Sequence, residues 1–301
     1  MSKITQALEK AARERGHRPA APQEPTVTAG PVVVSVTPVF TRRGVGHVAS
    51  AGQVKIDPHI ISAADPKSPI AEQYRMLRAN LESLHMRPSV KVIVVTSAVR
   101  GEGKSVTAVN LALTFARKPN MRVVLVDADM RKSSVPKWLG LTECRQGLST
   151  ILQQDGELDG SLIRLEYPPL NILPAGPCPD HPAELLQSTN MRRLLATLRA
   201  EFDLVVLDAP PLLPVADPGI LASQADGALL VVRIGKTHRK AVLEAQGIIT
   251  KLKAKVLGCV LTHVEHYLPG YERYYRYYQQ HEQREGRAPS TQAPEATSAT
   301  S

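Results

Sequence analysis

The residues with the clearest chemical signature run from Arg100 to Ser105 and read RGEGKS. Gly101 and Gly103 allow the backbone to curl so that successive N–H groups point at phosphate oxygens. Lys104 is placed to reach the β- and γ-phosphates of a nucleotide, and Ser105 is placed to ligate Mg²⁺. The spacing predicts a nucleotide-binding P-loop, whose candidate residues are Arg100, Gly101, Glu102, Gly103, Lys104, Ser105 and Val106.

One position departs from the full pattern G-x-x-x-x-G-K-[ST], because Ala98 stands where the pattern has its first glycine. A fortuitous glycine loop is therefore the alternative interpretation. The flanking sequence favours the P-loop, since a β-branched apolar run over 90–95 precedes it and a helix-like period over 106–116 follows it. Strand, loop and helix then occur in the order that a P-loop requires.

Two aspartates, Asp127 and Asp129, end the apolar stretch that begins at residue 122. Residues two apart in an extended chain lie on the same side, so both carboxylates would share one side. The carboxyl ends of strands in a doubly wound sheet open on the ligand crevice, which would place both acids near the nucleotide. Capping of the next helix is the structural alternative, and it accounts for one of the acids but not for the pair.

A second apolar run, EFDLVVLDAPP, ends in Asp208. An apolar strand ending in aspartate, on a chain with a P-loop, is the Walker-B arrangement that holds Mg²⁺, usually through water. Arg131 and Lys132 could contact phosphates, and Asp217 is expected in a loop that supports the switch region. The candidate metal ligands are Ser105, Asp129 and Asp208.

These residues need a scaffold in which strands and helices alternate. Helix-like segments at 147–156 and 182–200 are separated by a short strand at 170–174. Another strand at 228–234, a helix at 239–252 and a strand at 256–262 complete the series. The alternation predicts an α/β fold of the P-loop NTPase type, with a doubly wound, mostly parallel sheet and helices on both faces.

The composition excludes several classes of protein. The chain has 301 residues, of which 43% are hydrophobic, enough for a large core. Its three cysteines form no C-x-x-C pair, which argues against a zinc ribbon or a disulfide framework and fits a reducing cytoplasm. No apolar run approaches the roughly 18 residues of a membrane span, and no signal-peptide core begins the chain. We expect a cytoplasmic protein.

The formal charge of +9 invites a nucleic-acid interpretation. Residues 1–57 hold eight Lys and Arg against four Asp and Glu, so 4 of the 9 excess charges lie in this segment. A mildly basic arm is more typical of solubility, or of weak attraction to an anionic membrane face, than of sequence recognition. We therefore expect no nucleic-acid partner.

The ends of the chain differ from its middle. Residues 2–15 carry a short apolar stripe that fits either a docking helix or an unstable exposed helix. Residues 16–54 are rich in Pro, Ala, Thr, Val and Gly and are interpreted as a flexible linker. The predicted division is a flexible basic, Pro-rich arm over 1–56, a P-loop domain over 57–266, and a tyrosine cluster with a disordered tail over 267–301.

A helix is expected over 70–84, preceded by Ser68 and Pro69. Its apolar stripe consists of Ile70, Tyr74, Leu77, Leu81 and Leu84. The other face carries Glu72, Arg75 and Arg78. This spacing permits ion pairs within the helix. It also permits a subunit contact in which Glu72 of one chain pairs with Arg75 and Arg78 of another.

Six of the eight tyrosines are Tyr267, Tyr271, Tyr274, Tyr275, Tyr277 and Tyr278. Core packing is a poor explanation, because charged residues interleave the rings and Pro269-Gly270 detaches the segment. A stacking platform for single-stranded nucleic acid is a second interpretation. In the third, the hydroxyls are substrates that reach the γ-phosphate in a neighbouring subunit, and each phosphate adds nearly two negative charges.

Together these motifs resemble those of the bacterial tyrosine kinases (BY-kinases) over about residues 55–280. TSAVRGEGKS resembles the family's T-S-x-x-P-G-E-G-K-S, with Arg100 in place of proline. VLVDADMRKS resembles its Walker A′ motif, DLVVLDAPP its Walker B, and GPCPDHPAELL its loop G-x-x-P-x-N-P-x-E-L-L. AEQYRMLRANL resembles its E-x-x-R-x-x-R oligomerisation helix, and the tyrosine-rich segment resembles its autophosphorylation cluster.

The resemblance implies an ATP- and Mg²⁺-dependent protein-tyrosine autokinase that phosphorylates its tail in trans within a ring of copies. Asp127 is the candidate for accepting the tyrosine proton, a role that it could exchange with Asp129. Thr262 stands where the family usually has an asparagine that contacts adenine. The implied catalytic residues are Lys104, Asp127, Asp129 and Asp208.

The resemblance also implies partners. The family regulates exopolysaccharide synthesis and export, and is switched on by the cytoplasmic end of a membrane-spanning polysaccharide co-polymerase. Because this chain shows no span, that activator is expected to be a separate polypeptide that recruits the kinase to the inner face of the membrane. A cognate tyrosine phosphatase is a further candidate partner.

A rival interpretation is a nucleotide-switched scaffold that transfers nothing to tyrosine, as in the more distantly similar MinD/ParA-type ATPases. Their loop carries a signature lysine where this chain has Val99. That difference and the tyrosine cluster favour the kinase.

Overall fold

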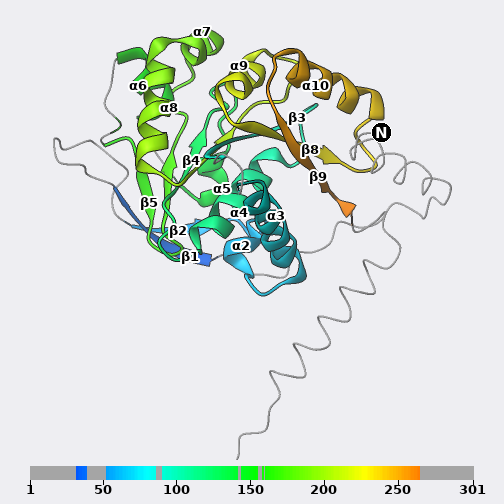
Figure 1. The fold of residues 1–301 in the computed structure, drawn as a ribbon. Helices are drawn as coiled ribbons and strands as arrows, with labels where there is room; N and C mark the ends of the chain where they lie inside the picture. Colours follow the sequence, from blue (N-terminus) through cyan, green and yellow to red (C-terminus); the bar gives the residue numbers. More distant parts are fainter. Residues whose placement is uncertain are drawn as a thin grey trace, which may run out of the picture.

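A computed structural model describes residues 32–38, 52–85, 90–141, 144–154, 158 and 160–264 (Figure 1). The predictions for residues 2–15, for the tyrosines of 267–278 and for the tail lie outside these ranges. The strands are β1 (Val32–Pro38), β2 (Gly52–Ile56), β3 (Val92–Ser97), β4 (Val123–Asp127), β5 (Ile163–Leu165), β6 (Leu170–Leu173), β7 (Leu204–Asp208), β8 (Gly227–Arg233) and β9 (Val256–Thr262). The helices are α2 (Ile61–Ala64), α3 (Pro69–His85), α4 (Lys104–Ala116), α5 (Val135–Leu139), α6 (Leu148–Gln154), α7 (Pro182–Gln187), α8 (Thr189–Glu201), α9 (Asp217–Gln224) and α10 (Arg239–Lys251).

The strands form one nine-stranded sheet in the order β2-β1-β5-β6-β4-β7-β3-β8-β9. The run from β6 to β9 is parallel throughout, whereas β5, β1 and β2 extend it with antiparallel pairings. The centre of the sheet is therefore the parallel group β4-β7-β3, as a doubly wound fold requires. This confirms the predicted α/β, P-loop NTPase-type architecture.

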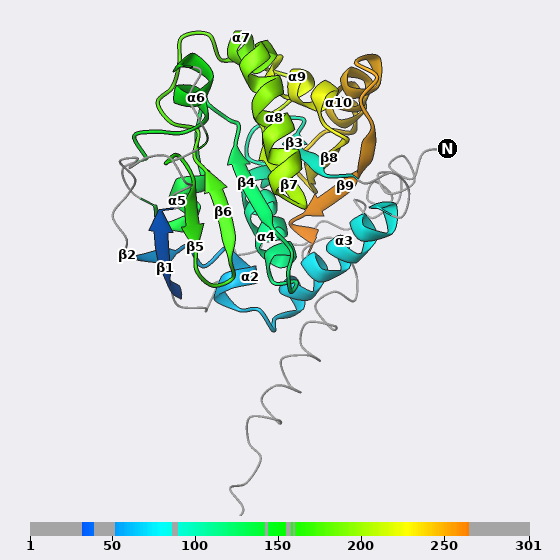
Figure 2. The same cartoon turned by 60° about the vertical axis from the view of Figure 1, so that its left-hand side comes forward.

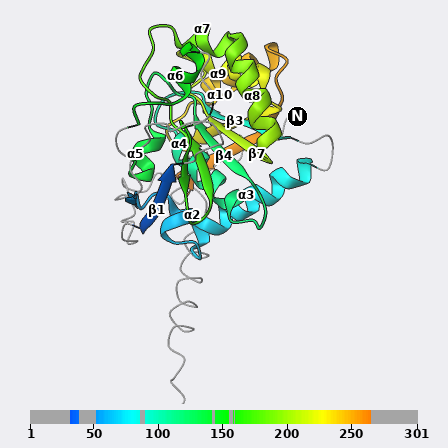
Figure 3. The same ribbon diagram turned by 90° about the vertical axis from the view of Figure 1, so that its left-hand side faces the viewer.

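Helices cover both faces of the sheet (Figures 1 and 2). Alternate residues of β3 point to opposite faces, so Val92 and Val94 join one core while Ile93 and Val95 join the other. The first core packs against α6 to α10, and the second against α2 to α5. Figure 3 shows α2 and α3 below the strands and α7 and α8 above them. Within the described part of the chain, no helix is both long and apolar enough to cross a bilayer.

The prediction of a flexible linker over 16–54 is wrong for residues 32–38 and 52–54, which belong to β1 and β2, a hairpin-like pair at the sheet edge. The run VVVSVTP has the β-branched composition of a strand, but the surrounding Pro and Gly concealed it. β1 pairs with β5, which the sequence analysis also missed. The division of the whole chain into three parts stays a prediction.

The predicted helix over 182–200 is two helices, because the chain turns at Ser188. Ser188 has extended backbone geometry, and its hydroxyl accepts the N–H of Met191 to cap α8. The short helices α2, α5 and α9 were not predicted. Asp217, expected in a loop, is instead the first residue of α9 and is almost fully buried.

The start of β3 is held by a carboxylate. Asp226 accepts the backbone N–H groups of Lys91 and Val92, both at 2.7 Å, and a guanidinium N–H of Arg199 at 2.8 Å. Burial alone would raise the pKa of Asp226, but the hydrogen bonds from Arg199 and the two amides outweigh it and lower that pKa. The charged carboxylate therefore stabilises the fold above pH ~4, and that stabilisation is lost as pH falls through the lowered pKa.

We expect Asp226→Asn to lower the free energy of unfolding at pH 7 by about 1–3 kcal/mol, because one amide donor must then face the backbone donors. The deficit shrinks as pH falls below ~4, because the unfolded wild-type chain then takes up a proton at Asp226 that the folded chain, with its lowered pKa, does not yet bind. Urea unfolding at pH 7 and pH 3.5 measures both values, with the exposed Asp180→Asn as the matched control. Equal stability of Asp226→Asn and wild type at pH 7 would contradict this account.

Candidate active site

The predicted site residues come together at the carboxyl ends of β3, β4 and β7. Asp127 and Asp208 are the last residues of β4 and β7 and are register partners across this parallel pair. Val95 of β3 is the partner of Asp208 on the other side. The P-loop leaves the end of β3 and enters α4, so it lies over the same edge of the sheet.

Gly101 and Gly103 have φ angles of 79° and 91°, the left-handed region that a side chain disfavours. Gly103 is also the residue that precedes the first turn of α4. The loop therefore curls as the sequence predicted, and α4 begins directly after it with no side-chain cap on its first turn, a helix start of the kind that binds anions. Arg100 and Gly101 are exposed, whereas Ser105 is buried.

Lys104 lies between two carboxylates, Asp208 at the end of β7 and Asp129 two residues after β4. Its Nζ is 2.9 Å from Asp129 Oδ2 and 3.3 Å from Asp208 Oδ1, and it donates to Ser105 Oγ at 3.1 Å. Burial opposes the charge, but Asp208 and Asp129 outweigh it and raise the pKa of Lys104. The lysine is therefore a fixed cation at neutral pH, positioned by the acids that the sequence analysis named.

Asp208 is completely buried, and its second oxygen, Oδ2, has no hydrogen-bond partner among the described residues. Burial raises the pKa of Asp208, and Lys104 opposes that shift. A buried carboxylate oxygen without a donor suits a cation. Ser105 Oγ and Asp129 lie around the same lysine, so oxygen donors of the kind that Mg²⁺ prefers are grouped here.

The described residues include no group of three or more His, Cys, Asp or Glu side chains that could by themselves hold a metal ion. Mg²⁺ at phosphate sites is commonly bound by one or two protein groups, with phosphate and water oxygens completing the shell. The donor set of Ser105 and the strand-end carboxylates therefore fits a nucleotide-bound Mg²⁺ better than a resident metal.

Asp127 has a different environment from Asp129. Its Oδ2 accepts the hydroxyl of Ser133 at 2.8 Å and the N–H groups of Ser134 and Val135, both at 3.1 Å, so it caps α5. Burial and then the charge of Asp208 raise the pKa of Asp127 to about 7. The capping alternative thus describes Asp127, whereas Asp129 faces Lys104.

Some contacts of the site were not predicted. Ser134 donates its hydroxyl to Ser105 Oγ at 2.9 Å, and only its position after the Walker A′-like stretch could have indicated this. Arg131 donates to both oxygens of Asp217 at 2.7 and 3.0 Å, a pair that links the segment after β4 to the start of α9. Thr262 donates to the carbonyl of Glu102 at 2.8 Å, so its hydroxyl contacts the P-loop backbone. The adenine contact of Thr262 stays a prediction.

The charged face of α3 forms its contacts within the single chain. Arg75 is ion-paired with Glu72 one turn earlier and donates to the carbonyl of Pro66 at 2.6 Å. Arg78 donates to the carbonyl of Thr114 at 2.9 Å, and its Nε is buried with no partner among the described residues. The intrahelical interpretation therefore holds for Glu72 and Arg75, and the subunit contact stays a prediction.

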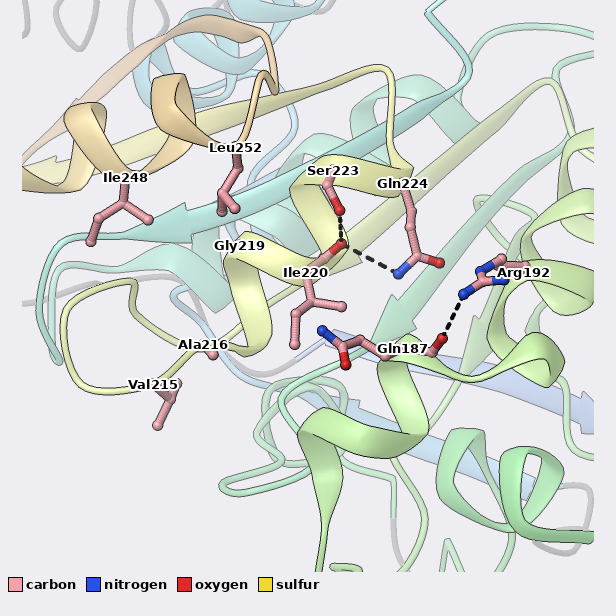
Figure 4. Close-up of a pocket in the computed structure, with 10 residues that line it drawn as sticks. All are labelled: Gln187, Arg192, Val215, Ala216, Gly219, Ile220, Ser223, Gln224, Ile248 and Leu252. Carbon is pink, nitrogen blue, oxygen red and sulfur yellow. Dashed lines mark hydrogen bonds between the residues drawn. The ribbon is translucent and has the colours of Figure 1, made fainter.

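A groove lined mainly by apolar side chains lies elsewhere, between α7, α9 and α10 (Figure 4). Ile220 of α9 and Ile248 and Leu252 near the end of α10 contribute to it. Gly219 lies close to Leu252, since an added Cβ would lie 2.6 Å from a methyl group of that exposed side chain. Its lining includes neither the P-loop nor the three aspartates, so it is separate from the candidate active site.

Comparison with known proteins agrees with this geometry. The family model described as "AAA domain" matches residues 90–255, more than half of the chain. The tyrosine-protein kinase YwqD of Bacillus subtilis (strain 168) is 38% identical over 207 residues, covering 69% of this chain and 86% of that protein. This chain belongs to the bacterial tyrosine kinases. The putative tyrosine-protein kinase CapB of Staphylococcus aureus is 32% identical over 196 residues, covering 65% of this chain and 85% of CapB.

Solved structures place the chain in the same group. The crystal structure of the chimerical protein CapA2B2 is matched with a TM-score of 0.64 and 32% identity, over 68% of this chain and 89% of that one. The kinase domain of the Escherichia coli tyrosine kinase ETK is matched with a TM-score of 0.64 and 25% identity, over 73% and 83% of the two chains. Membership of the bacterial tyrosine kinases, predicted from the motifs, is confirmed.

Proposed function

We propose that this chain is an ATP-dependent protein-tyrosine autokinase that phosphorylates the tyrosines of 267–278 on a neighbouring copy. The observation that carries the proposal is the position of Lys104, which follows the left-handed glycines of the P-loop and is held by Asp129 and Asp208. A fixed cation among strand-end carboxylates is the arrangement that phosphoryl transfer needs. Membership of the tyrosine kinases supports tyrosine as the acceptor.

The P-loop amides from Arg100 to Val106 and the ammonium of Lys104 would bind the phosphates of ATP. Ser105, Asp129 and Asp208 would hold Mg²⁺, directly or through water. When bound, Mg²⁺ supplies neutralisation of the negative charge that develops on the transferred group. The protein's contribution is mostly positioning, because phosphoryl transfer requires little covalent chemistry from the enzyme.

The acceptor needs a base, since a phenol has a pKa of about 10. As the tyrosine oxygen bonds to the γ-phosphorus, the bond to the β–γ bridging oxygen breaks, ADP leaves and the phenolic proton passes to a carboxylate. Asp127 is our candidate for that carboxylate, and its raised pKa of about 7 suits a base at neutral pH. Asp127 accepts three hydrogen bonds at Oδ2 and the N–H of Asp129 at Oδ1, which restricts a phenol's access to it and keeps Asp129 as the alternative base.

The proposed assembly is a ring of copies joined through Glu72, Arg75 and Arg78, with each tail entering a neighbouring site. The side chains of Glu72 and Arg75 stay 44% and 38% exposed although they pair with each other, which supports their availability to a neighbouring copy. A separate membrane-spanning polysaccharide co-polymerase would activate the kinase and recruit it from the cytoplasm to the inner membrane face. Exopolysaccharide synthesis or export would be the regulated process, with a tyrosine phosphatase reversing the modification.

Incubation of the purified full-length chain with γ-labelled ATP and Mg²⁺ tests the activity. We expect label on tyrosine and none on serine or threonine. Label should be lost when the divalent cation is removed with a chelator. Hydrolysis of ATP without any labelled tyrosine, even with the membrane activator present, would instead favour a nucleotide-switched scaffold.

A further inference from the structure

The only acidic residue inside the P-loop, Glu102, is turned into the protein. Its side chain is almost fully buried, with 1% exposed. Glu102 Oε2 accepts the N–H of Val99 at 2.7 Å, which joins the two sides of the loop. A carboxylate that faced the phosphates would repel them. The carboxylate of Glu102 instead points into the protein, where it accepts a hydrogen bond from the loop backbone.

The other oxygen of Glu102 bonds to the segment between β8 and α10. Oε1 accepts the hydroxyl of Thr237 and the backbone N–H of Arg233, the latter at 3.4 Å. Thr237 is itself nearly buried, and its own N–H donates to the carbonyl of Arg233 at 3.0 Å. The hydroxyl is therefore presented by a closed turn, which gives it a fixed direction.

The backbone of Glu102 also forms a hydrogen bond, because its carbonyl accepts the hydroxyl of Thr262 at the end of β9. Glu102 is thus bonded to the ends of both β8 and β9. It lies between Gly101 and Gly103, whose left-handed backbone gives the loop its curl. Contacts at this residue act directly on the conformation that points the N–H groups at phosphate.

We propose that Glu102 and Thr237 form a latch that holds the P-loop in its phosphate-binding conformation, so that both are positioning residues for nucleotide binding. The latch rests on the proposed function in one respect, because Mg-ATP is taken as the ligand that the P-loop binds. It assigns a role to Thr237, more than 130 residues away in sequence from the loop that it holds.

The test measures the dissociation constant of Mg-ATP for full-length variants by calorimetric titration. Thr237→Val keeps the shape but removes the hydroxyl, and we expect about tenfold weaker binding. Thr237→Ser keeps the hydroxyl and should recover affinity to within about threefold of wild type. Thr250→Val, at an exposed threonine of α10, is the matched control and should bind as wild type does.

Glu102→Gln provides a second, independent variant. The oxygen of a glutamine amide can still accept the N–H of Val99, but its NH₂ group then faces the N–H of Arg233, and the hydroxyl of Thr237 must reverse its role and accept. We expect a loss of affinity of about three- to tenfold, because one charged acceptor is lost. Hydrogen exchange of residues 98–105 without nucleotide should become faster in Glu102→Gln and Thr237→Val, while exchange in α8 stays unchanged.

Wild-type affinity in Thr237→Val, or equal loss of affinity in Thr237→Val and Thr237→Ser, would overturn the latch. A lowered unfolding temperature with unchanged affinity would also overturn it, because the contact would then support the fold alone. Titration does not depend on transfer to tyrosine. A wild-type chain that binds Mg-ATP but labels no tyrosine would therefore refute the proposed function. The dissociation constants of wild type, Thr237→Val and Thr237→Ser would still decide whether the latch exists.

Discussion

Lys104→Met is expected to reduce transfer of label from ATP to tyrosine by at least about 100-fold, the usual effect of removing one group that stabilises the developing charge. The side chain is only 13% exposed and forms ion pairs with Asp129 and Asp208, so its charge is fixed between these two carboxylates. Initial rates of tyrosine labelling under saturating Mg-ATP measure the effect.

The matched control for this substitution is Lys118→Met. Lys118 follows the far end of α4 and is about half exposed, where it pairs with Glu82 on the surface. We expect its labelling rate to stay within about twofold of wild type, since exposed ion pairs contribute little. Because methionine leaves Asp129 and Asp208 without their cation, circular dichroism and thermal unfolding must show that Lys104→Met is folded. Activity of a folded Lys104→Met near the wild-type rate would contradict the proposed site.

Replacing all six tyrosines of the cluster by phenylalanine is expected to remove nearly all label from the chain. Phenylalanine keeps the ring and removes the hydroxyl that we propose as the phosphoryl acceptor, so binding of Mg-ATP should be unaffected. Tyrosine labelling and nucleotide titration of the same preparation separate the two properties. The substituted residues are Tyr267, Tyr271, Tyr274, Tyr275, Tyr277 and Tyr278.

Tyr167→Phe is the matched control, because Tyr167 lies outside the cluster and is 74% exposed. This variant should label as wild type does. Full labelling of the six-phenylalanine chain, or loss of label in Tyr167→Phe, would show that the cluster is not the acceptor. Loss of Mg-ATP binding in the six-phenylalanine chain would contradict the separation of acceptor and nucleotide site.

The geometry of the candidate nucleotide site was largely predictable because its signals are local. The glycines, Lys104 and Ser105 follow a β-branched strand and open a helix, and Asp208 ends an apolar run. Each of these patterns is contained in a few consecutive residues, so no knowledge of distant contacts was needed.

What was missed depends on contacts between distant segments. The difference between Asp127 and Asp129 arises from how the chain turns after β4 and brings the donors of residues 133–135 back to Asp127. Thr237 contacts Glu102 only because β8 lies beside β3 in the sheet. β1 is stabilised by pairing with β2 and β5, and its Pro- and Gly-rich surroundings favour a loop when they are considered alone.

The central claim is transfer between copies, and a mixing experiment tests it most directly. In our proposal, folded Lys104→Met chains carry acceptor tyrosines without a working active site, and six-phenylalanine chains carry an active site without acceptors. We predict that neither preparation labels alone with γ-labelled ATP and Mg²⁺. When the two are mixed, label should appear on tyrosine of the Lys104→Met chain, at a rate that rises with the concentration of the other. Absence of label in the mixture, while wild-type chains label in parallel, would contradict transfer in trans.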